Sequence, residues 1–534
     1  MQTEGDRQPY SRRVRFWIAA GLILLLALVL RLFGLNKGLW LDEYQSVYEF
    51  AGNSALRHMA QVLRSDIHPP LYFSMLQVWR RVGGEGEPYL RLLNVAISLA
   101  WAGVAIAWLK MYHRSAALLA GLIIATTPFL LRYGQEIEDY PLMVFFTVLA
   151  FYFTGSFLRD PRKKSGALLA GIALTAALCA HLIAILLPAC VLAFAGTALV
   201  ADGFSQREAD LGLLVSQRIR RFLPLVVAVL VLPLLTGLVL WRFYFFHNGA
   251  KLMQWIPPLS WSLALTLAHT LLGFTAPLGA WTVTCEFLMM TALLAGAFGN
   301  WRRSLPFLAA GAAYLAQLVL FSLFVRPALV DRYFLPALVL LIAWFSVQLA
   351  SVGNVRLRRL GVSCVVLLAA IDGVQWVRTG AWIPVESWRD LGPLITPQMD
   401  SSTELFVQPD YALGILRHYV PGVPSERILA VPAGATAGEF LQKSMPARFS
   451  RAIVVFRGPD GLSASGVDAL LRAVRLHLTR PGIVETYFVS LTTSREGDLD
   501  PFLHATDVVL GEPRQWLRQG TLRMARFELA IADR

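Results

Sequence analysis

The chain has 534 residues, of which 56% are hydrophobic and only 16% are charged. A chain of this length and apolarity exceeds what one water-soluble core can hold, which excludes an ordinary soluble enzyme and predicts a polytopic membrane protein. The net charge of +13 does not indicate nucleic-acid binding, because all of the excess lies before residue 378 and the remainder carries 17 basic and 17 acidic residues. Short basic clusters beside apolar segments set membrane orientation instead, so we expect no nucleic-acid partner.

Hydropathy divides the first part of the chain into apolar runs that are long enough to cross a bilayer. The first run follows a cluster of four arginines and lacks a small-residue cleavage site, so we interpret it as a retained helix and not as a signal peptide. The eleven expected spans are 16–35, 90–109, 115–131, 141–158, 166–180, 182–200, 222–241, 279–298, 304–324, 333–350 and 360–377.

The distribution of basic residues predicts the orientation. With a cytoplasmic N-terminus, the clusters at 159–164 and 207–221 fall on the cytoplasmic side, as the positive-inside rule requires. An odd number of spans then exports the tail. We therefore expect an integral protein of the bacterial inner membrane with outer features at 36–89 and 242–278 and an extracytoplasmic C-terminal domain.

The first outer loop opens on two acidic residues, Asp42 and Glu43, a few positions after the first span. A carboxylate beside a membrane is costly unless it is paired, hydrated or bound to a metal, so the pair is a candidate site. The structural alternative is a solvated loop end next to the aromatic anchor Trp40.

Later in the same loop comes His68-Pro69-Pro70-Leu71-Tyr72. The prolines force His68 into extended geometry and stiffen the turn, which either holds a side chain over a site or redirects the chain.

A third cluster, residues 132–141, lies between the third and fourth spans with almost no loop. It contains Arg132, Glu136, Glu138, Asp139 and Tyr140. We expect these groups at the membrane surface, either as part of a site or as acidic residues that complement the dipole of the following helix.

A fourth cluster, Asp331-Arg332-Tyr333, opens the tenth span. Its structural alternative is an interfacial Arg/Tyr anchor. All four clusters are predicted on the outer side and should converge there, whereas a transporter would place polar groups near mid-membrane. This arrangement favours an enzyme that acts at the outer leaflet. His181 is expected at an outer helical turn, in a structural role.

From residue 378 onward, short strands alternate with helices and no nucleotide-binding motif is present. This predicts a small α/β domain, with 1–377 as the membrane domain, including the outer loop 36–89, and 378–534 as a soluble extracytoplasmic domain. The expected strands are 404–408, 427–431, 451–457, 485–491 and 522–530, and the expected helices are 410–419, 437–443 and 463–478.

Together the four motifs resemble the GT-C glycosyltransferases, in particular the bacterial relatives of protein O-mannosyltransferases and of the aminoarabinose lipid A transferase. The resemblance covers about residues 10 to 377 and includes the order of the motifs. It implies a polyprenyl-phosphate sugar as donor, a hydroxyl-bearing acceptor in the cell envelope, and transfer with inversion. The alternative class is a non-catalytic protein that binds or transports lipid-linked glycans.

The resemblance also implies roles for individual residues. Asp42 is the expected base and Glu43 assists it or orders the site, while Arg332, with Arg132 or His68, meets the lipid phosphate. We expect Tyr140 and Tyr333 to belong to the same substrate site.

One position departs from the family pattern. Relatives carry an arginine where this chain has Glu138, which leaves open a different sugar, a bound divalent cation, or a second acid beside Asp139. No metal ligand and no other cofactor is assigned from the sequence.

Overall fold

The structure is a computed structural model. It describes residues 10–50, 68–203, 211–248, 281–382, 384–433, 436–458, 462–490, 500–519 and 522–529, with 256, 258–261, 263 and 267. The chain forms two compact units. The membrane unit contains Met1–Leu35 and Ser46–Ala381, and the sheet unit contains Asn36–Gln45 and Trp382–Arg534. Most of the expected outer feature 242–278 lies outside the described residues.

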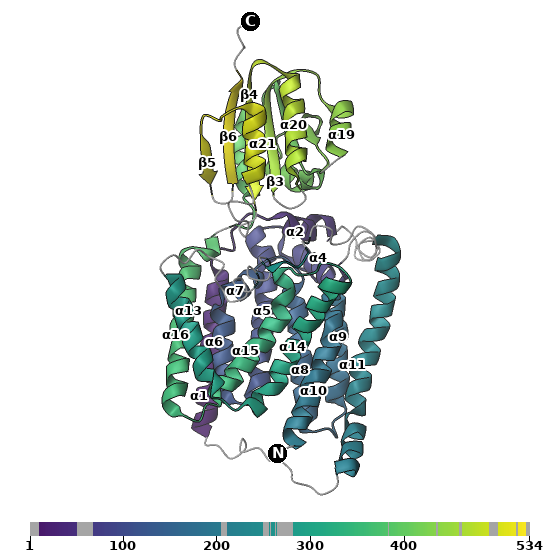
Figure 1. Cartoon of the computed structure of the whole chain (residues 1–534), viewed down its shortest axis with the longest axis vertical. Coiled ribbons are helices and arrows are strands. Elements are labelled where there is room, and N and C mark those ends of the chain that lie inside the picture. Colours follow the sequence, from purple (N-terminus) through teal and green to yellow (C-terminus); the bar gives the residue numbers. More distant parts are fainter. Residues whose placement is uncertain are drawn as a thin grey trace. The chain divides into compact units, whose positions relative to one another are not determined.

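The membrane unit is helical (Figure 1). Its helices are α1 (Tyr10–Leu32), α4 (Leu71–Gly83), α5 (Glu87–Lys110), α6 (Arg114–Thr126), α7 (Pro128–Tyr133), α8 (Tyr140–Arg159), α9 (Ser165–Ala180), η2 (Leu182–Leu186), α10 (Leu187–Gly203), α11 (Leu211–Asn248), α13 (Trp281–Ala297), α14 (Trp301–Phe324), η3 (Asp331–Phe334), α15 (Leu335–Ala350) and α16 (Val355–Arg378). Among the described residues, eight helical segments are long and apolar enough to cross a membrane, and three more are apolar but shorter.

Every expected span coincides with one of these eleven apolar segments, which confirms a polytopic helical membrane protein. The short ones are α6, α9 and part of α13. Hydropathy therefore located the segments correctly.

Large apolar side chains cover the outside of this unit as well as its interior. Leu22 and Leu25 of α1 are 62% and 54% exposed. Water would disfavour such a surface, whereas hydrocarbon solvates it. Inside, Trp108 packs its ring against Phe151 and Phe307, with centroids 5.4 and 5.2 Å apart.

The sheet unit contains a six-stranded sheet of order β2-β1-β3-β4-β6-β5. Its first four strands in that order are mutually parallel, and β6 and β5 add antiparallel to one edge. The strands are β1 (Thr403–Gln408), β2 (Ile428–Ala430), β3 (Phe449–Gly458), β4 (Leu478–Ser490), β5 (Trp516–Gln519) and β6 (Leu522–Leu529). All five expected strands are confirmed, and β5 is an addition.

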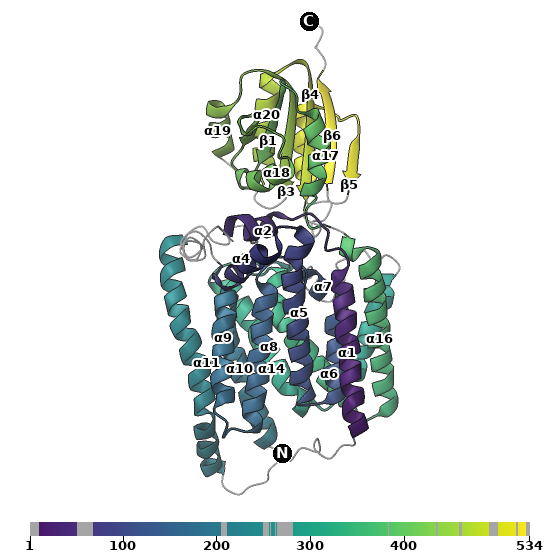
Figure 2. The ribbon, with the colours of Figure 1, turned by 180° about the vertical axis from the view of Figure 1, so that it is seen from behind.

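Helices cover both faces of the sheet. The helical segments are α2 (Leu41–Tyr44), η4 (Gly380–Trp382, at the boundary), η5 (Trp388–Asp390), α17 (Leu391–Ile395), η6 (Thr396–Gln398), η7 (Asp410–Ala412), α18 (Leu413–Tyr419), η8 (Ser425–Arg427), α19 (Thr436–Ser444), α20 (Ala464–His477) and α21 (Asp500–Leu510). Figure 1 shows α20 and α21 over one face, and Figure 2 shows α17 and α18 from behind, over the other.

The core of the sheet unit therefore has two layers. One joins the sheet to α20 and α21, through residues such as Phe456 and Leu470. The other joins the sheet to Trp388, α17 and α18, and it includes Leu41. A side chain from the segment Asn36–Gln45 thus belongs to a core that the C-terminal part of the chain builds.

Candidate active site

The two expected catalytic carboxylates lie on the short helix α2 of the sheet unit. The Trp40 backbone N–H donates to Glu43 Oε2 at 3.4 Å, and Glu43 is only 1% exposed. Asp42 is half-buried. The side chain of Glu43 therefore closes the turn of its own segment, and Asp42 is the more accessible of the two acids.

A third carboxylate, Glu386, lies beside this segment within the sheet unit. Its Oε2 accepts hydrogen bonds from the Leu41 N–H at 3.2 Å and from the Trp388 indole, and its Oε1 accepts from Arg457 Nε at 2.9 Å. Burial raises the pKa of Glu386, while Arg457 and these hydrogen bonds oppose the rise. Sequence reasoning missed Glu386, because nothing in its local pattern distinguishes it from a surface acid.

In the membrane unit, three of the other motifs meet in one aromatic and polar cluster around His181. The His181 ring lies 5.6 Å from His68, 5.1 Å from Tyr140 and 5.3 Å from Tyr333, between ring centroids. The Arg332 guanidinium lies over the Tyr140 ring at 5.7 Å. These residues come from the loop before α4, the start of α8, the α9–η2 junction and η3, so the expected convergence holds for this set.

His181 has the central place that the sequence did not assign to it. Its Nδ1 accepts the Ile183 backbone N–H at 3.1 Å, so its Nε2 carries the proton of the neutral ring. This Nε2 is buried and has no hydrogen-bond partner among the described residues. It is therefore an unused hydrogen-bond donor within the cluster. The sequence signal that could have identified His181 as a site residue is its position at the break between two apolar runs.

The turn before α8 is buried within the protein, and side chains from other segments satisfy its backbone polar groups. Asn94 of α5 donates to the carbonyls of Glu136 and Glu138, the latter at 2.8 Å. Gln135 donates to the carbonyls of Arg31 at 2.8 Å and Phe33 at 2.6 Å. Glu136, Glu138 and Asp139 are accordingly 5%, 4% and 0% exposed.

Within this turn the charged groups have separate tasks. Arg132 Nε pairs with Glu136 Oε1 at 2.7 Å, so much of its charge is already compensated. Glu138 Oε1 accepts the Ser46 hydroxyl at 3.2 Å. Asp139 is the N-cap residue of α8, the position where an acidic side chain complements the helix dipole, although its side chain makes no capping hydrogen bond.

Among the residues that the structure describes, His68, Asp139 and His181 could hold a metal ion, since one ligand-type atom from each lies within 4.8 Å of the others. Imidazole and carboxylate suit zinc and related ions. However, the proton on His181 Nε2 blocks its lone pair, and the positive charge of Arg332 acts on the same ring. The arrangement fits hydrogen bonding better than cation binding.

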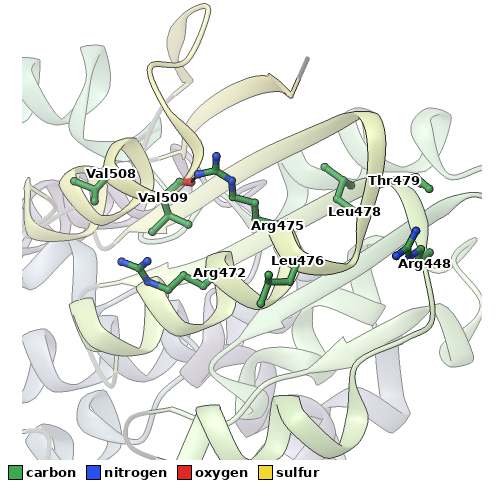
Figure 3. A pocket seen from close by; sticks show the side chains of 8 residues that line it. All are labelled: Arg448, Arg472, Arg475, Leu476, Leu478, Thr479, Val508 and Val509. Atoms are coloured by element: carbon green, nitrogen blue, oxygen red, sulfur yellow. Dashed lines mark hydrogen bonds between the residues drawn. The ribbon is translucent and has the colours of Figure 1, made fainter. Parts of the chain in front are cut away.

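The sheet unit also has a surface hollow of about 730 Å³ between α20, α21 and the start of β4. Figure 3 shows Arg448, Arg472 and Arg475 around Leu476 in its lining. Arg472 pairs with Asp468 at 2.8 Å, and Arg475 donates to the Val509 carbonyl. Because two of the three guanidinium groups already have partners on the protein, we assign no ligand to this hollow.

No protein-family model and no curated protein sequence matches the chain. Among solved structures, it is similar to ArnT from Cupriavidus metallidurans, in the apo state (13% identity) and bound to undecaprenyl phosphate (14%), each covering 97% of this chain and 98% of that one with a TM-score of 0.48. It is also similar to the archaeal oligosaccharyltransferase AglB from Archaeoglobus fulgidus in complex with an inhibitory peptide and a dolichol-phosphate, at 12% identity over 90% of this chain and 70% of that one, TM-score 0.47.

A further similar structure is the arabinofuranosyltransferase AftD from Mycobacteria, at 14% identity and a TM-score of 0.47. The match covers 98% of this chain and 40% of AftD.

Proposed function

We propose that this chain is a GT-C-type membrane glycosyltransferase that moves a sugar from a polyprenyl-phosphate donor to a hydroxyl-bearing envelope acceptor at the outer face of the inner membrane. The observation that supports it best is the cluster in the membrane unit. It brings His68, Tyr140, His181, Arg332 and Tyr333 together from four distant segments. Their side chains supply a cation, a hydrogen-bond donor and aromatic faces, which are the groups that a phosphate-linked sugar requires.

Asp42 is the proposed base. Its carboxylate takes the proton of the acceptor hydroxyl while the acceptor oxygen attacks the anomeric carbon, and the bond from that carbon to the phosphate oxygen breaks. Attack from the side opposite the leaving phosphate inverts the anomeric configuration. Glu43, whose side chain is bonded to its own turn, orders the segment.

The leaving group is a lipid phosphate that gains negative charge as the bond breaks. Arg332 is its proposed partner, because a planar guanidinium can donate to two phosphate oxygens at once. The Nε2–H of His181 is a second donor. We assign the lipid phosphate to Arg332 and not to Arg132 because Arg332 lies over the Tyr140 ring of the His181 cluster, whereas Arg132 pairs with Glu136 in the turn before α8. Which sugar is carried is set by the shape of the site around these groups.

The test is glycosyl transfer by the purified protein with labelled polyprenyl-phosphate sugars, read as release of the lipid phosphate. Asp42→Asn should lower turnover by about 100- to 10,000-fold, the range for loss of a general base, with donor binding retained. Asp500→Asn, an exposed acid in the same unit, is the matched control and should transfer normally.

The competing function is binding or transport of a lipid-linked glycan without chemistry. It predicts that wild-type protein binds the donor but releases no lipid phosphate with any acceptor. Equal loss of donor binding and turnover in Asp42→Asn would also favour it.

A further inference from the structure

The segment that carries Asp42 is built into the fold of the sheet unit. Asn36–Gln45 groups with Trp382–Arg534 and not with the helices that precede and follow it in the chain. Leu41, the neighbour of Asp42, lies in the same core layer as Trp388 and Ile415. The conformation of this segment therefore depends on residues more than 300 positions away.

Glu386 is the central anchor. It is 0% exposed and accepts from the Leu41 backbone N–H, the group immediately before Asp42. Its other oxygen accepts from Arg457 on β3 at 2.9 Å. A buried pair of this kind is poor evidence of stabilisation, because the desolvation of both charges offsets their attraction. Its specific effect is to join the backbone next to Asp42 to a strand of the sheet.

Two further side chains hold the segment, again through its backbone. The Tyr419 hydroxyl accepts the Leu39 N–H at 2.6 Å. Arg389 Nη1 donates to the Asn36 carbonyl at 3.1 Å, and its Nη2 donates to the Lys37 carbonyl at 3.3 Å. Because these bonds engage main-chain atoms, they fix where the segment runs without occupying the side chain of Asp42.

After Asp42, an aromatic contact also holds the segment against α18. The Tyr44 ring lies 5.7 Å from His418, and a Cβ at Gly414 would lie 2.8 Å from the Tyr44 ring. The helix α18 thus accepts Tyr44 closely only because residue 414 is glycine. Anchors lie on both sides of Asp42.

We propose that Glu386 and Tyr419 are positioning residues for Asp42, so that the C-terminal part of the chain holds the catalytic segment in its working conformation. This inference rests on the proposed role of Asp42. Glu386 and Tyr419 act through the backbone at Leu41 and Leu39 and do not touch the substrate. Removing either anchor should lower the turnover number and leave donor binding unchanged, because a base that moves by about 1 Å loses alignment but not affinity for the donor.

The experiment uses the full-length protein in detergent and compares Tyr419→Phe, Glu386→Gln and the control Glu485→Gln. Glu485 is likewise a buried acid paired with an arginine, Arg451, at 2.7 Å in the same sheet. The two readouts are kcat and KM for the donor, and hydrogen exchange of a peptide that covers residues 36–45. Tyr419→Phe removes one hydroxyl and keeps the ring, so it still tests the positioning role if Glu386→Gln fails to fold.

We expect kcat to fall by about 10- to 100-fold in both anchor variants at unchanged donor KM, with faster exchange in the 36–45 peptide. Glu485→Gln should match wild type in both readouts. In an Asp42→Asn background, Glu386→Gln should cause little additional loss, because the two act on one step.

Unchanged exchange, or faster exchange at normal kcat, in both anchor variants would overturn the positioning role. So would fully additive losses with Asp42→Asn. Absence of lipid-phosphate release by the wild-type protein would overturn the proposed function itself, and retained turnover in Asp42→Asn would overturn the role of Asp42 as the base. Normal turnover in Tyr419→Phe and Glu386→Gln beside an inactive Asp42→Asn would overturn the positioning role alone.

Discussion

At the scale of single residues, the placement of a charge among its neighbours separates groups that look equivalent in the sequence. Arg132 and Arg332 were both candidates for the lipid phosphate. The structure pairs Arg132 with Glu136, whereas Arg332 lies over an aromatic ring of the His181 cluster. Likewise Asp42 and Glu43 are adjacent, but Glu43 is buried and bonded to its own backbone, whereas Asp42 is half-buried.

The first prediction at this scale concerns Arg332 and the binding of the donor. Arg332→Ala should weaken binding of a polyprenyl-phosphate sugar by about 10-fold or more, and Arg332→Lys should weaken it less, since lysine keeps the charge but loses the planar fork. Donor binding measured by titration checks this. Indifference of binding to both substitutions would remove Arg332 from the site.

A second prediction concerns the group of His68, Asp139 and His181 and whether turnover needs a metal ion. Because the hydrogen bond at His181 Nδ1 places the proton on Nε2, we expect transfer to survive prolonged treatment with EDTA. Turnover before and after chelation, with the metal content of the protein measured in parallel, decides the question. Activity that disappears with EDTA and returns with a divalent ion would show that the tautomer at His181 is the other one.

At the scale of elements, close helix packing in the membrane unit depends on small residues. A Cβ at Gly171 of α9 would lie 2.4 Å from the Ala228 carbonyl oxygen of α11. Gly196 of α10 has no atom within 4 Å of a Cβ added there. The same substitution should therefore have opposite consequences at two glycines that both lie in apolar helices.

Gly171→Ala should destabilise the protein by about 1–3 kcal/mol, because backbone atoms cannot yield as a flexible side chain can. Gly196→Ala should be neutral or stabilise by up to about 1 kcal/mol, since alanine restricts the unfolded chain more than glycine. Thermal unfolding of the two variants in the same detergent measures the difference. Equal melting temperatures would contradict the tight α9–α11 contact.

Whether an element could be predicted from the sequence depended on how much of its pattern is local. Spans and the inner strands were predicted because long apolar runs and short apolar segments bounded by turns leave clear patterns. The strand β5 (Trp516–Gln519) was not predicted, since it is short, lies at the sheet edge and exposes most of its side chains. Its pairing with β6 decides its conformation, and hydropathy does not report pairing.

At the scale of the whole molecule, the orientation in the membrane remains a prediction from charge. Cysteine at Lys163, in an expected cytoplasmic loop, should react with a membrane-impermeant thiol reagent only after cells are permeabilised. Cysteine at Ser465, in the expected extracytoplasmic domain, should react in intact cells with the outer membrane removed. The native cysteines are buried or half-buried, so a variant without them serves as the background. Reversed labelling would place the Asp42 segment on the cytoplasmic side.

The sequence alone determined that this is a polytopic helical membrane protein with an α/β tail, and it predicted which motifs form the candidate site. Hydropathy, charge and strand patterns involve residues that are close together in the chain, so they can be recognised from the sequence. The tertiary structure decided that His181 joins the other motifs and that Glu386 holds the Leu41 backbone across 345 residues. Such contacts depend on which surfaces pack together when the chain folds, and no local pattern encodes that choice.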